Sequence, residues 1–512
     1  MLVKVYGSAV FGVEATTITI EVNVATGIGY HLVGLPDNAV KESSYRITAA
    51  LQNTGYKFPG KKIIVNMAPA DLRKEGSAYD LTFALGILTA SGQIKAENIS
   101  DYLIMGELSL DGSLQPIKGA LPIAIKAREE GFKGFILPKQ NAKEAAVVNG
   151  LEIYGVDNIL EVIRFFDKEE PLEQTLINTR EEFYKNLDNP EHDFADVKGQ
   201  ESIKRCMEIA AAGGHNIILI GPPGAGKTML AKRLPSILPP MTLHEALETT
   251  KIHSVVGRIR ENVGLMSQRP FRSPHHTISD VALVGGGAYP QPGEISLSHN
   301  GVLFLDELPE FKRGVLEVMR QPLEDREVTI SRAKFTVTYP SSFMLVASMN
   351  PSPSGYFNDP DSPVTSSPAE MQRYLSKISG PLLDRIDIHI EVTPVPFEKL
   401  SEERRGESSV EIRKRVTAAR EIQTQRFKEN ENVHYNAQMS VRQIREFCDL
   451  DEASKQLLKT AMERLNLSAR AYDRILKVSR SIADLEQSEN IAANHISEAI
   501  QYRSLDRDGW LG

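Results

Sequence analysis

Residues 221–228 read GPPGAGKT, and this short segment limits what the chain around it can fold into. It fits the G-x-x-x-x-G-K-[ST] pattern of a phosphate-binding loop. The apolar run at residues 217–220 predicts a buried parallel strand, and residues 229–234 predict a helix. Strand, glycine-rich turn and helix together indicate a parallel α/β fold, in which backbone N–H groups and a helix N-terminus surround phosphate. The two flanking elements argue against a chance glycine-rich turn.

The fixed positions of this loop have separate chemical roles. The glycines let the backbone wrap closely around phosphate, the lysine reaches the β- and γ-phosphates, and the final hydroxyl is a ligand for Mg²⁺. The sequence therefore predicts ATP and Mg²⁺ as cofactors. The candidate nucleotide contacts are Gly221, Pro222, Pro223, Gly224, Ala225, Gly226, Lys227 and Thr228.

A second motif, VLFLDE at residues 302–307, is an apolar run that ends in two acids. A buried strand with acids at its end is where a P-loop enzyme holds its metal and polarises its water. Asp306 is predicted to position Mg²⁺ together with Thr228, and Glu307 to act as the general base toward the attacking water. Acids at strand ends are common by themselves, so the pair is informative because it accompanies the glycine-rich loop.

A third apolar run, residues 343–347, predicts a strand that is followed closely by Asn350. An amide at that strand end can orient the attacking water if the strand lies beside the phosphate loop. The alternative is an ordinary turn, for which Asn-Pro is well suited.

Two arginines are further candidates. Arg385 precedes a predicted strand, and an arginine supplied across a subunit boundary can stabilise charge on the transferred phosphoryl group. The alternative is a structural ion pair with Asp384 or Asp387. Arg470 stands at the start of a predicted helix and could reach the nucleotide from the last domain, or it could be a surface arginine.

Composition sets outer limits on the kind of protein. A chain of 512 residues suggests roughly three domains at ~150 residues each. The net charge of −8 gives no global basic signature, but a local basic surface would suffice for nucleic acid. Two cysteines exclude a disulfide framework and indicate a reducing compartment. We expect a cytoplasmic protein without a membrane span, because the N-terminus lacks a signal-peptide pattern and no apolar run approaches ~18 residues.

The chain divides into four parts by its patterns. We predict an α/β domain at residues 1–168, a charged linker at 169–193, an α/β ATPase core at 194–395 and an all-helical domain at 396–512. The middle of the linker could instead be a solvated surface helix. Predicted strands cover residues 17–24, 62–66, 134–138 and 386–392, and predicted helices cover residues 79–90, 117–130, 410–427, 441–448, 453–465, 471–485 and 492–502.

These motifs together resemble the AAA+ superfamily, and more narrowly the Mg-chelatase-like AAA+ ATPases of the ComM/YifB group. Residues 272–277, 292–297, 300–311 and 379–387 carry the narrower likeness, which extends over essentially the whole chain. The resemblance implies an ATP-hydrolysing hexamer with nucleotide at subunit interfaces and a C-terminal helical lid. It also implies Asn350 as sensor 1, Arg385 as an arginine finger acting in trans and Arg470 as sensor 2.

The same resemblance implies a DNA translocase or helicase of the ComM type, which promotes branch migration during natural transformation. The alternative is an ATP-driven protein remodeller, the role of the Mg-chelatase relatives. Basic residues that could contact DNA phosphates are Arg258, Arg260, Arg332 and Lys334, although each could equally be an exposed charge on a solvated loop.

The N-terminal part resembles the Lon protease domain (the ribosomal S5 domain 2-like fold, ChlI type) through residues 74–78, 106–112 and 116–119. By position the serine and lysine of that family fall on Ala78 and Leu121. Ser77 is one residue away and Lys118 three, and a one-residue shift on a helix turns a side chain by about 100°. We therefore expect a non-proteolytic domain that binds DNA or assembles the ring.

A further difference concerns the stretch after Asn350, where many relatives carry cysteine pairs. In this chain the stretch holds serines instead, at Ser352, Ser354, Ser366 and Ser367. Serine hydroxyls are poor zinc ligands compared with cysteine thiolates, so no zinc is expected.

Overall fold

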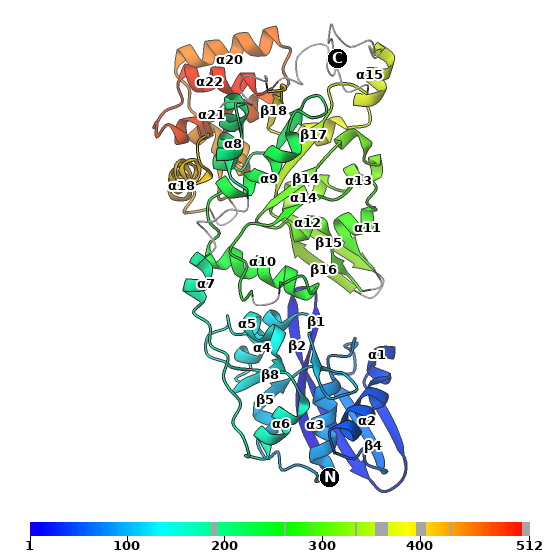
Figure 1. The fold of residues 1–512 in the computed structure, drawn as a ribbon. Coiled ribbons are helices and arrows are strands. Elements are labelled where there is room, and N and C mark those ends of the chain that lie inside the picture. The colour runs from blue at the N-terminus through cyan, green and yellow to red at the C-terminus, as the bar shows by residue number, and fades with distance from the viewer. Residues whose placement is uncertain are drawn as a thin grey trace. The chain divides into compact units, whose positions relative to one another are not determined.

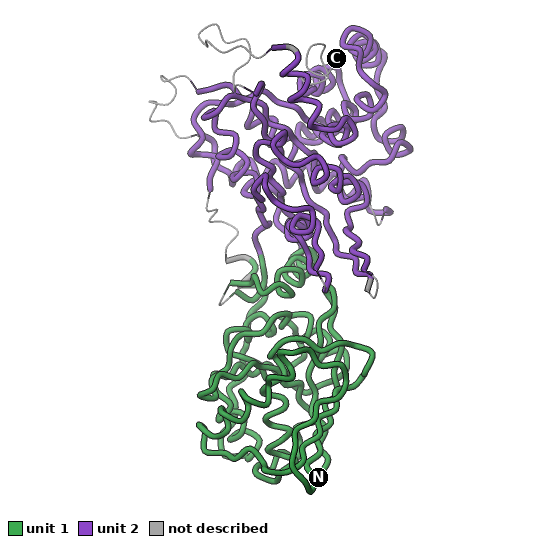
Figure 2. Tube along the Cα trace, turned by 90° about the vertical axis from the view of Figure 1, so that its right-hand side faces the viewer, with its two compact units in different colours: residues 1–185, 243–266 green, residues 186–242, 267–512 purple. Residues whose placement is uncertain are grey.

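The computed structural model describes residues 1–185, 192–260, 263–287, 289–332, 335–353, 367–395, 406–430 and 433–503. Within it the chain forms two compact units (Figure 2). The first contains residues 1–185 and 243–266, and the second contains residues 186–242 and 267–512. Among the described residues, no helix is long and apolar enough to cross a bilayer.

The first unit is built on a mixed seven-stranded sheet with the strand order β3-β4-β2-β1-β5-β8-β9. Figure 1 labels β1, β2, β4, β5 and β8 of this sheet. β1 pairs with β2 in antiparallel register along its whole length, and β5, β8 and β9 continue the sheet as parallel neighbours. The strands are β1 (Leu2–Phe11), β2 (Glu14–Ala25), β3 (Gly29–Val33), β4 (Lys62–Ala68), β5 (Tyr102–Ile104), β8 (Gly134–Pro138) and β9 (Glu152–Val156), with a small pair formed by β6 (Glu107–Leu108) and β7 (Leu114–Gln115).

Helices cover this sheet and supply much of its core. All residues of α3 (Asp80–Ala90) are buried, as expected for a helix that is apolar on every side. Both α3 and α4 (Ala120–Glu129) pack against β2. The remaining helices of the unit are α1 (Asn38–Lys41), α2 (Ser43–Asn53), α5 (Lys139–Ala145), α6 (Ile159–Phe166), α7 (Thr179–Lys185) and α10 (Leu243–Val255).

The segment at residues 243–266 lies between the two main ATPase motifs in sequence but folds with the first unit. Its helix α10 packs against α4, and the Gly119 N–H donates to the carbonyl of Ser254 at 3.0 Å. Inside the first unit, the hydroxyl of Ser254 also donates to the buried carboxyl of Glu144. The candidate DNA contacts Arg258 and Arg260 therefore belong to this unit.

The second unit contains a five-stranded sheet with the order β11-β14-β17-β10-β18. Every neighbouring pair in it is parallel, so all five carboxyl ends lie at one edge. Parallel strands connected by helices bury both faces, which explains why β10 and β14 are buried at every position. The strands are β10 (Ile217–Ile220), β11 (Phe271–Arg272), β14 (Val302–Leu305), β17 (Met344–Met349) and β18 (Ile388–Glu391).

Helices and two hairpins surround this sheet. The two antiparallel pairs are β15 (Glu327–Arg332) with β16 (Phe335–Pro340), and β12 (Gly285–Gly286) with β13 (Gln291–Pro292). The helices are α8 (Glu201–Gly213), α9 (Lys227–Ile237), α11 (Asp280–Val284), α12 (Glu294–Leu297), α13 (Arg313–Glu317), α14 (Arg320–Asp325), α15 (Pro368–Leu375) and α16 (Gly380–Leu383).

The C-terminal part of the second unit is helical, as its sequence periodicity predicts. α21 has eleven buried residues and packs against α8, α18 and α22 (Figure 1). The mixed α/β class, the parallel sheet and the C-terminal helical region are thus confirmed. The helices are α18 (Ser409–Arg426), α19 (Val441–Phe447), α20 (Glu452–Arg464), α21 (Ala469–Leu485) and α22 (Ala493–Gln501).

A buried polar cluster joins the start of the parallel sheet to α21. The ring of His215, which lies just before β10, is fully buried between Asp387 at 2.9 Å from Nδ1 and Ser481 at 2.8 Å from Nε2. Burial lowers the pKa of His215, although the carboxylate of Asp387 opposes that shift. Burial also lowers the pKa of His389 on β18 well below its ordinary value, and the nearby charge of Arg503 adds to this effect.

We expect the second unit to lose stability as pH falls below about 6.5. Both histidines have folded-state pKa values below the ordinary 6.5, so the unfolded chain binds more protons in this range and acid favours unfolding. The thermal midpoint should decrease from pH 7.5 to pH 5.5, and His389→Leu should make that decrease smaller. His244→Gln is the control, because the His244 side chain is 83% exposed. An unchanged slope in His389→Leu would contradict the prediction.

Candidate nucleotide site

The glycine-rich loop lies at the carboxyl end of β10, between its two parallel neighbours β17 and β18. A ligand site at the carboxyl ends of parallel strands is the general rule for open α/β sheets. Gly221 approaches the sheet so closely that a Cβ there would lie 2.3 Å from the carbonyl oxygen of Val392. Gly226, with φ of 88°, precedes α9 in a left-handed conformation that suits glycine. The loop therefore needs glycine at both ends.

Lys227 is the first residue of α9, and its side chain folds back over the loop. Its ammonium group donates to the carbonyls of Gly221 and Pro222, the latter at 3.0 Å, and to Oδ1 of Asn350 at 3.1 Å. The residue is only 8% exposed, and burial lowers the pKa of Lys227, with Asp306 and Glu307 acting in the opposite direction.

Asp306 follows β14 and faces the start of α9. Its Oδ2 accepts a hydrogen bond from the Thr228 hydroxyl at 2.9 Å, and its Oδ1 accepts one from the hydroxyl of Ser348. Ser348 is fully buried on β17 and also accepts from the Glu307 N–H at 3.2 Å. Ser348 was not among the residues predicted for this site, although its place directly after the predicted strand and two residues before Asn350 is a signal for it.

Glu307 is the next residue and is exposed. It has φ of 55°, a left-handed conformation that is uncommon for a side-chain-bearing residue and concentrates at functional sites. Its carboxylate lies 3.8 Å from Nδ1 of His276, which also packs edge-on against Phe311. The sequence gives no indication of this position of His276 beside Glu307, which depends on the fold.

Asn350 directly follows β17 and completes this cluster. Besides accepting from Lys227, it accepts through its backbone carbonyl from the Tyr374 hydroxyl at 3.2 Å. Hydrogen bonds thus connect Lys227 with Asn350 and Thr228 with Asp306, at the ends of the adjacent strands β10, β14 and β17. These elements were predicted separately from sequence, and the sheet order brings them together.

Arg385 and Arg470 form a second group around residues 384–387. Arg385 donates to the carbonyl of Pro381 and to Glu324 of α14, and Arg470 donates to Asp384. Arg385 therefore forms a structural ion pair, but with Glu324 rather than with Asp384 or Asp387. Arg470, for which the alternative was a surface arginine, has an exposed side chain that pairs with Asp384. In this conformation neither arginine is hydrogen-bonded to the glycine-rich loop among the described residues.

The remaining candidates lie elsewhere. Arg258, Arg260 and Arg332 are exposed, and Lys334, Ser354 and Ser366 lie outside the described residues. In the first unit, Ser77 donates to Glu107, and Lys118 lies over Gly257. Ser77 and Lys118 therefore do not form a serine–lysine pair in this structure.

The donors at the loop fit a nucleotide with its metal. The Thr228 hydroxyl and the Asp306 carboxylate present two hard oxygen ligands 2.9 Å apart, which suits Mg²⁺. The ammonium of Lys227 contacts uncharged carbonyl and amide oxygens, which a phosphate can replace at the same place. Together these residues can hold Mg²⁺ and the β- and γ-phosphates.

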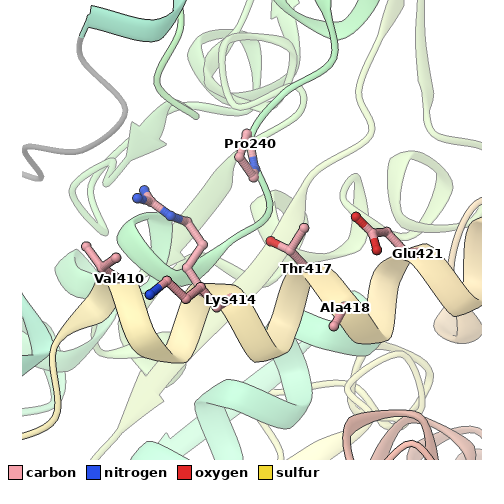
Figure 3. Close-up of a pocket in the computed structure, with 7 residues that line it drawn as sticks. Pro240, Val410, Lys414, Thr417, Ala418 and Glu421 are labelled. Carbon is pink, nitrogen blue, oxygen red and sulfur yellow. The ribbon is translucent and has the colours of Figure 1, made fainter.

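A separate surface pocket lies along α18 (Figure 3). Side chains of one face of that helix line it together with Pro240, including Val410, Lys414, Thr417 and Glu421. None of the candidate nucleotide residues lines this pocket, so it is distinct from the site at the glycine-rich loop.

Three family models match successive parts of the chain. They are described as subunit ChlI of Mg-chelatase at residues 20–141, magnesium chelatase subunit ChlI at residues 193–400, and the ChlI C-terminal region at residues 406–503. The fold and the loop therefore define a magnesium-chelatase type of AAA+ protein.

Similarity to individual proteins narrows this class. The chain is 45% identical to the competence protein ComM of Haemophilus influenzae over 508 residues, which cover 99% of this chain and 98% of that protein. It is 45% identical to YifB of Escherichia coli over 506 residues, covering 98% and 97%. A shorter match, 28% over 190 residues, joins 32% of this chain to 28% of the magnesium-chelatase 67 kDa subunit of Heliobacterium mobile. The chain belongs to the Mg-chelatase-like ComM/YifB family.

Proposed function

We propose that this protein is an ATP-hydrolysing motor that binds Mg-ATP at the glycine-rich loop. One observation carries the proposal: Lys227, Thr228, Asp306 and Asn350 form a connected cluster at the carboxyl ends of three parallel strands. Membership of an AAA+ family supports the same assignment. The two buried, unpaired cysteines are consistent with a reducing cytoplasm, where we expect the motor to act.

The side chains around the loop have separable roles in this proposal. Lys227 holds the β- and γ-phosphates, and Asn350 orients the water that attacks the γ-phosphorus. Glu307 takes the proton from that water, for which an exposed carboxylate next to the cluster is suited. Thr228 and Asp306 would hold Mg²⁺, which would neutralise the negative charge that develops on the phosphate oxygens.

We further propose that the active form is a homohexamer with nucleotide between subunits. Arg385 is bonded to Glu324 and Arg470 to Asp384, and not to the loop of the same chain, which is expected if Arg385 serves the neighbouring site. In this arrangement residues 194–395 are the AAA+ core, apart from residues 243–266, which fold with the first unit, and residues 396–512 are the lid. Residues 1–168 are a Lon-protease-like domain without proteolytic activity, because Ser77 bonds Glu107 rather than a lysine.

We propose that DNA is the substrate on which this motor acts. The full-length relative named as a competence protein supports a translocase or helicase that promotes branch migration of incoming DNA in natural transformation. Exposed Arg258, Arg260 and Arg332 could contact phosphates without reading sequence. The alternative is a protein remodeller. The match to a magnesium-chelatase subunit supports it, but this match covers only 32% of the chain.

DNA should stimulate ATP hydrolysis if this assignment is correct. We expect the ATPase rate to rise with single-stranded or branched DNA, and Arg332→Ala to reduce the DNA-stimulated rate more than the rate without DNA. The measurement compares single-stranded, duplex and branched DNA at low and moderate salt, since phosphate contacts weaken steeply with salt. Hydrolysis without any stimulation, together with no DNA binding at low salt, would favour the protein remodeller instead.

A further inference from the structure

We propose that Glu324 and Asp384 are positioning residues that hold Arg385 and Arg470 in a resting state. Each carboxylate keeps one arginine bonded within its own subunit until a nucleotide phosphate replaces it. The inference rests on the proposed function, because it takes the two arginines as the groups that reach phosphate. It adds two acidic residues whose removal should favour nucleotide binding rather than impair it.

Arg385 is held in a conformation that leaves part of its hydrogen-bonding capacity unused. Its guanidinium donates to Glu324 and to the Pro381 carbonyl. Its Nε is buried and has no hydrogen-bond partner among the described residues. A guanidinium engaged bidentately by a phosphate would use its N–H groups more fully, so the observed pairing is best understood as one of two available states.

Arg470 is held more loosely. It lies in the first turn of α21, with a side chain that is 72% exposed, and it donates to Asp384, whose side chain is 32% exposed. Ion pairs open to solvent contribute little to stability and exchange partners readily. The other holding carboxylate, Glu324, is also open to solvent, with a side chain that is 60% exposed, although the Arg385 side chain that it holds is only 14% exposed. Each carboxylate can therefore be solvated when its arginine leaves, so a phosphate can replace it.

The backbone between these contacts is fixed much more firmly. Asp387 is 2% exposed and bonds Arg474 at 2.7 Å and His215 at 2.9 Å, and Arg474 lies one turn after Arg470 on α21. The Asn216 side chain donates to the carbonyl of Arg385 at 2.9 Å. Breaking a buried pair of this kind is costly, so residues 384–387 stay in place while the guanidinium groups of Arg385 and Arg470 can change partner.

Because residues 384–387 are fixed while the two arginine side chains can change partner, Glu324 and Asp384 have a defined effect on nucleotide affinity. Because an arginine bonded to its holding carboxylate must leave it before contacting phosphate, the pair lowers the apparent affinity for nucleotide. Neutralising the acid removes that competition while the arginine remains. The effect must disappear when the arginine itself is absent.

The test measures the dissociation constant of a non-hydrolysable Mg-ATP analogue with the full-length protein. We expect Glu324→Gln to lower this constant about two- to fivefold, the size that an exposed ion pair implies. The same substitution in an Arg385→Ala background should have no effect. Asp384→Asn is expected to behave in the same way against Arg470→Ala. Light scattering checks that the compared samples have the same oligomeric mass.

Matched controls separate this effect from a general change of charge. Glu327→Gln removes an exposed carboxylate at the start of β15, and Glu446→Gln removes one on α19. An unchanged or raised dissociation constant in both Glu324→Gln and Asp384→Asn would overturn the inference, as would tightening that persists without the arginines. If Arg385→Ala instead left ATP turnover intact, the proposed role of Arg385 would fail, which is a different result.

Discussion

Glu307→Gln is expected to reduce ATP turnover by about 10²–10⁴-fold while Mg-ATP still binds. Glutamine has nearly the same size but cannot take a proton from the attacking water. The backbone at this position is anchored by the Glu307 N–H to Ser348 hydrogen bond, so the substitution should leave the strand end intact. Steady-state hydrolysis and equilibrium nucleotide binding, measured on the same preparation, test both halves of the prediction.

Two comparisons make this prediction specific. Glu310→Gln removes a nearby exposed carboxylate that pairs with Lys377 at 3.2 Å, and it should retain turnover. Lys227→Ala should behave differently from Glu307→Gln, because it removes the ammonium group at the loop and so weakens binding itself. Near-normal turnover in Glu307→Gln would show that another group acts as the base.

Arg385→Ala is expected to reduce turnover by about 10³–10⁵-fold, the range known for arginines that stabilise a transferred phosphoryl group from outside the loop. If Arg385 acts on the neighbouring subunit, one variant subunit disables a site that it does not itself carry. Mixing wild-type and Arg385→Ala subunits should then depress activity more than the same dilution with inactive protein would.

The control for this experiment is Arg373→Ala, which removes an exposed arginine of α15. Mixtures with that variant should retain full activity. Arg385→Lys is informative as well, because lysine keeps the charge but lacks the two-pronged geometry of arginine, so we expect only partial rescue. Turnover in mixed samples that falls only in proportion to the Arg385→Ala fraction would contradict action across an interface.

Local sequence pattern predicted the contiguous elements of the fold well. The strands predicted at residues 217–220, 302–305 and 134–138 coincide with β10, β14 and β8. Each is a short run of mostly apolar residues, and that composition alone predicts a buried strand. The pattern did not predict β1, which owes its ten residues of pairing to β2. Pairing between strands depends on a partner elsewhere in the chain, and no local periodicity reports it.

The candidate site likewise contains residues that contiguous motifs predicted and residues that only the fold identifies. The loop and the acids at residues 306–307 were predicted from contiguous motifs, and the structure brings Thr228 and Asp306 within 2.9 Å. Ser348 and His276 were not singled out as site residues, because the only signal for Ser348 is its place just before Asn350, and a histidine after a short strand carries no distinctive signal. Their importance is geometric: both lie beside the backbone or side chain of Glu307.

By itself, the sequence determined the phosphate loop, the acids after the strand at residues 302–305 and the helical character of the C-terminal region. These features depend on residues close together in the chain. Only the tertiary structure decided that residues 243–266 fold with the first unit, and that Arg470 pairs with Asp384 across 86 positions. Contacts between residues so far apart in the chain depend on how the whole domain buries its apolar faces. The charge of a residue or the periodicity of a helix does not by itself specify the partner.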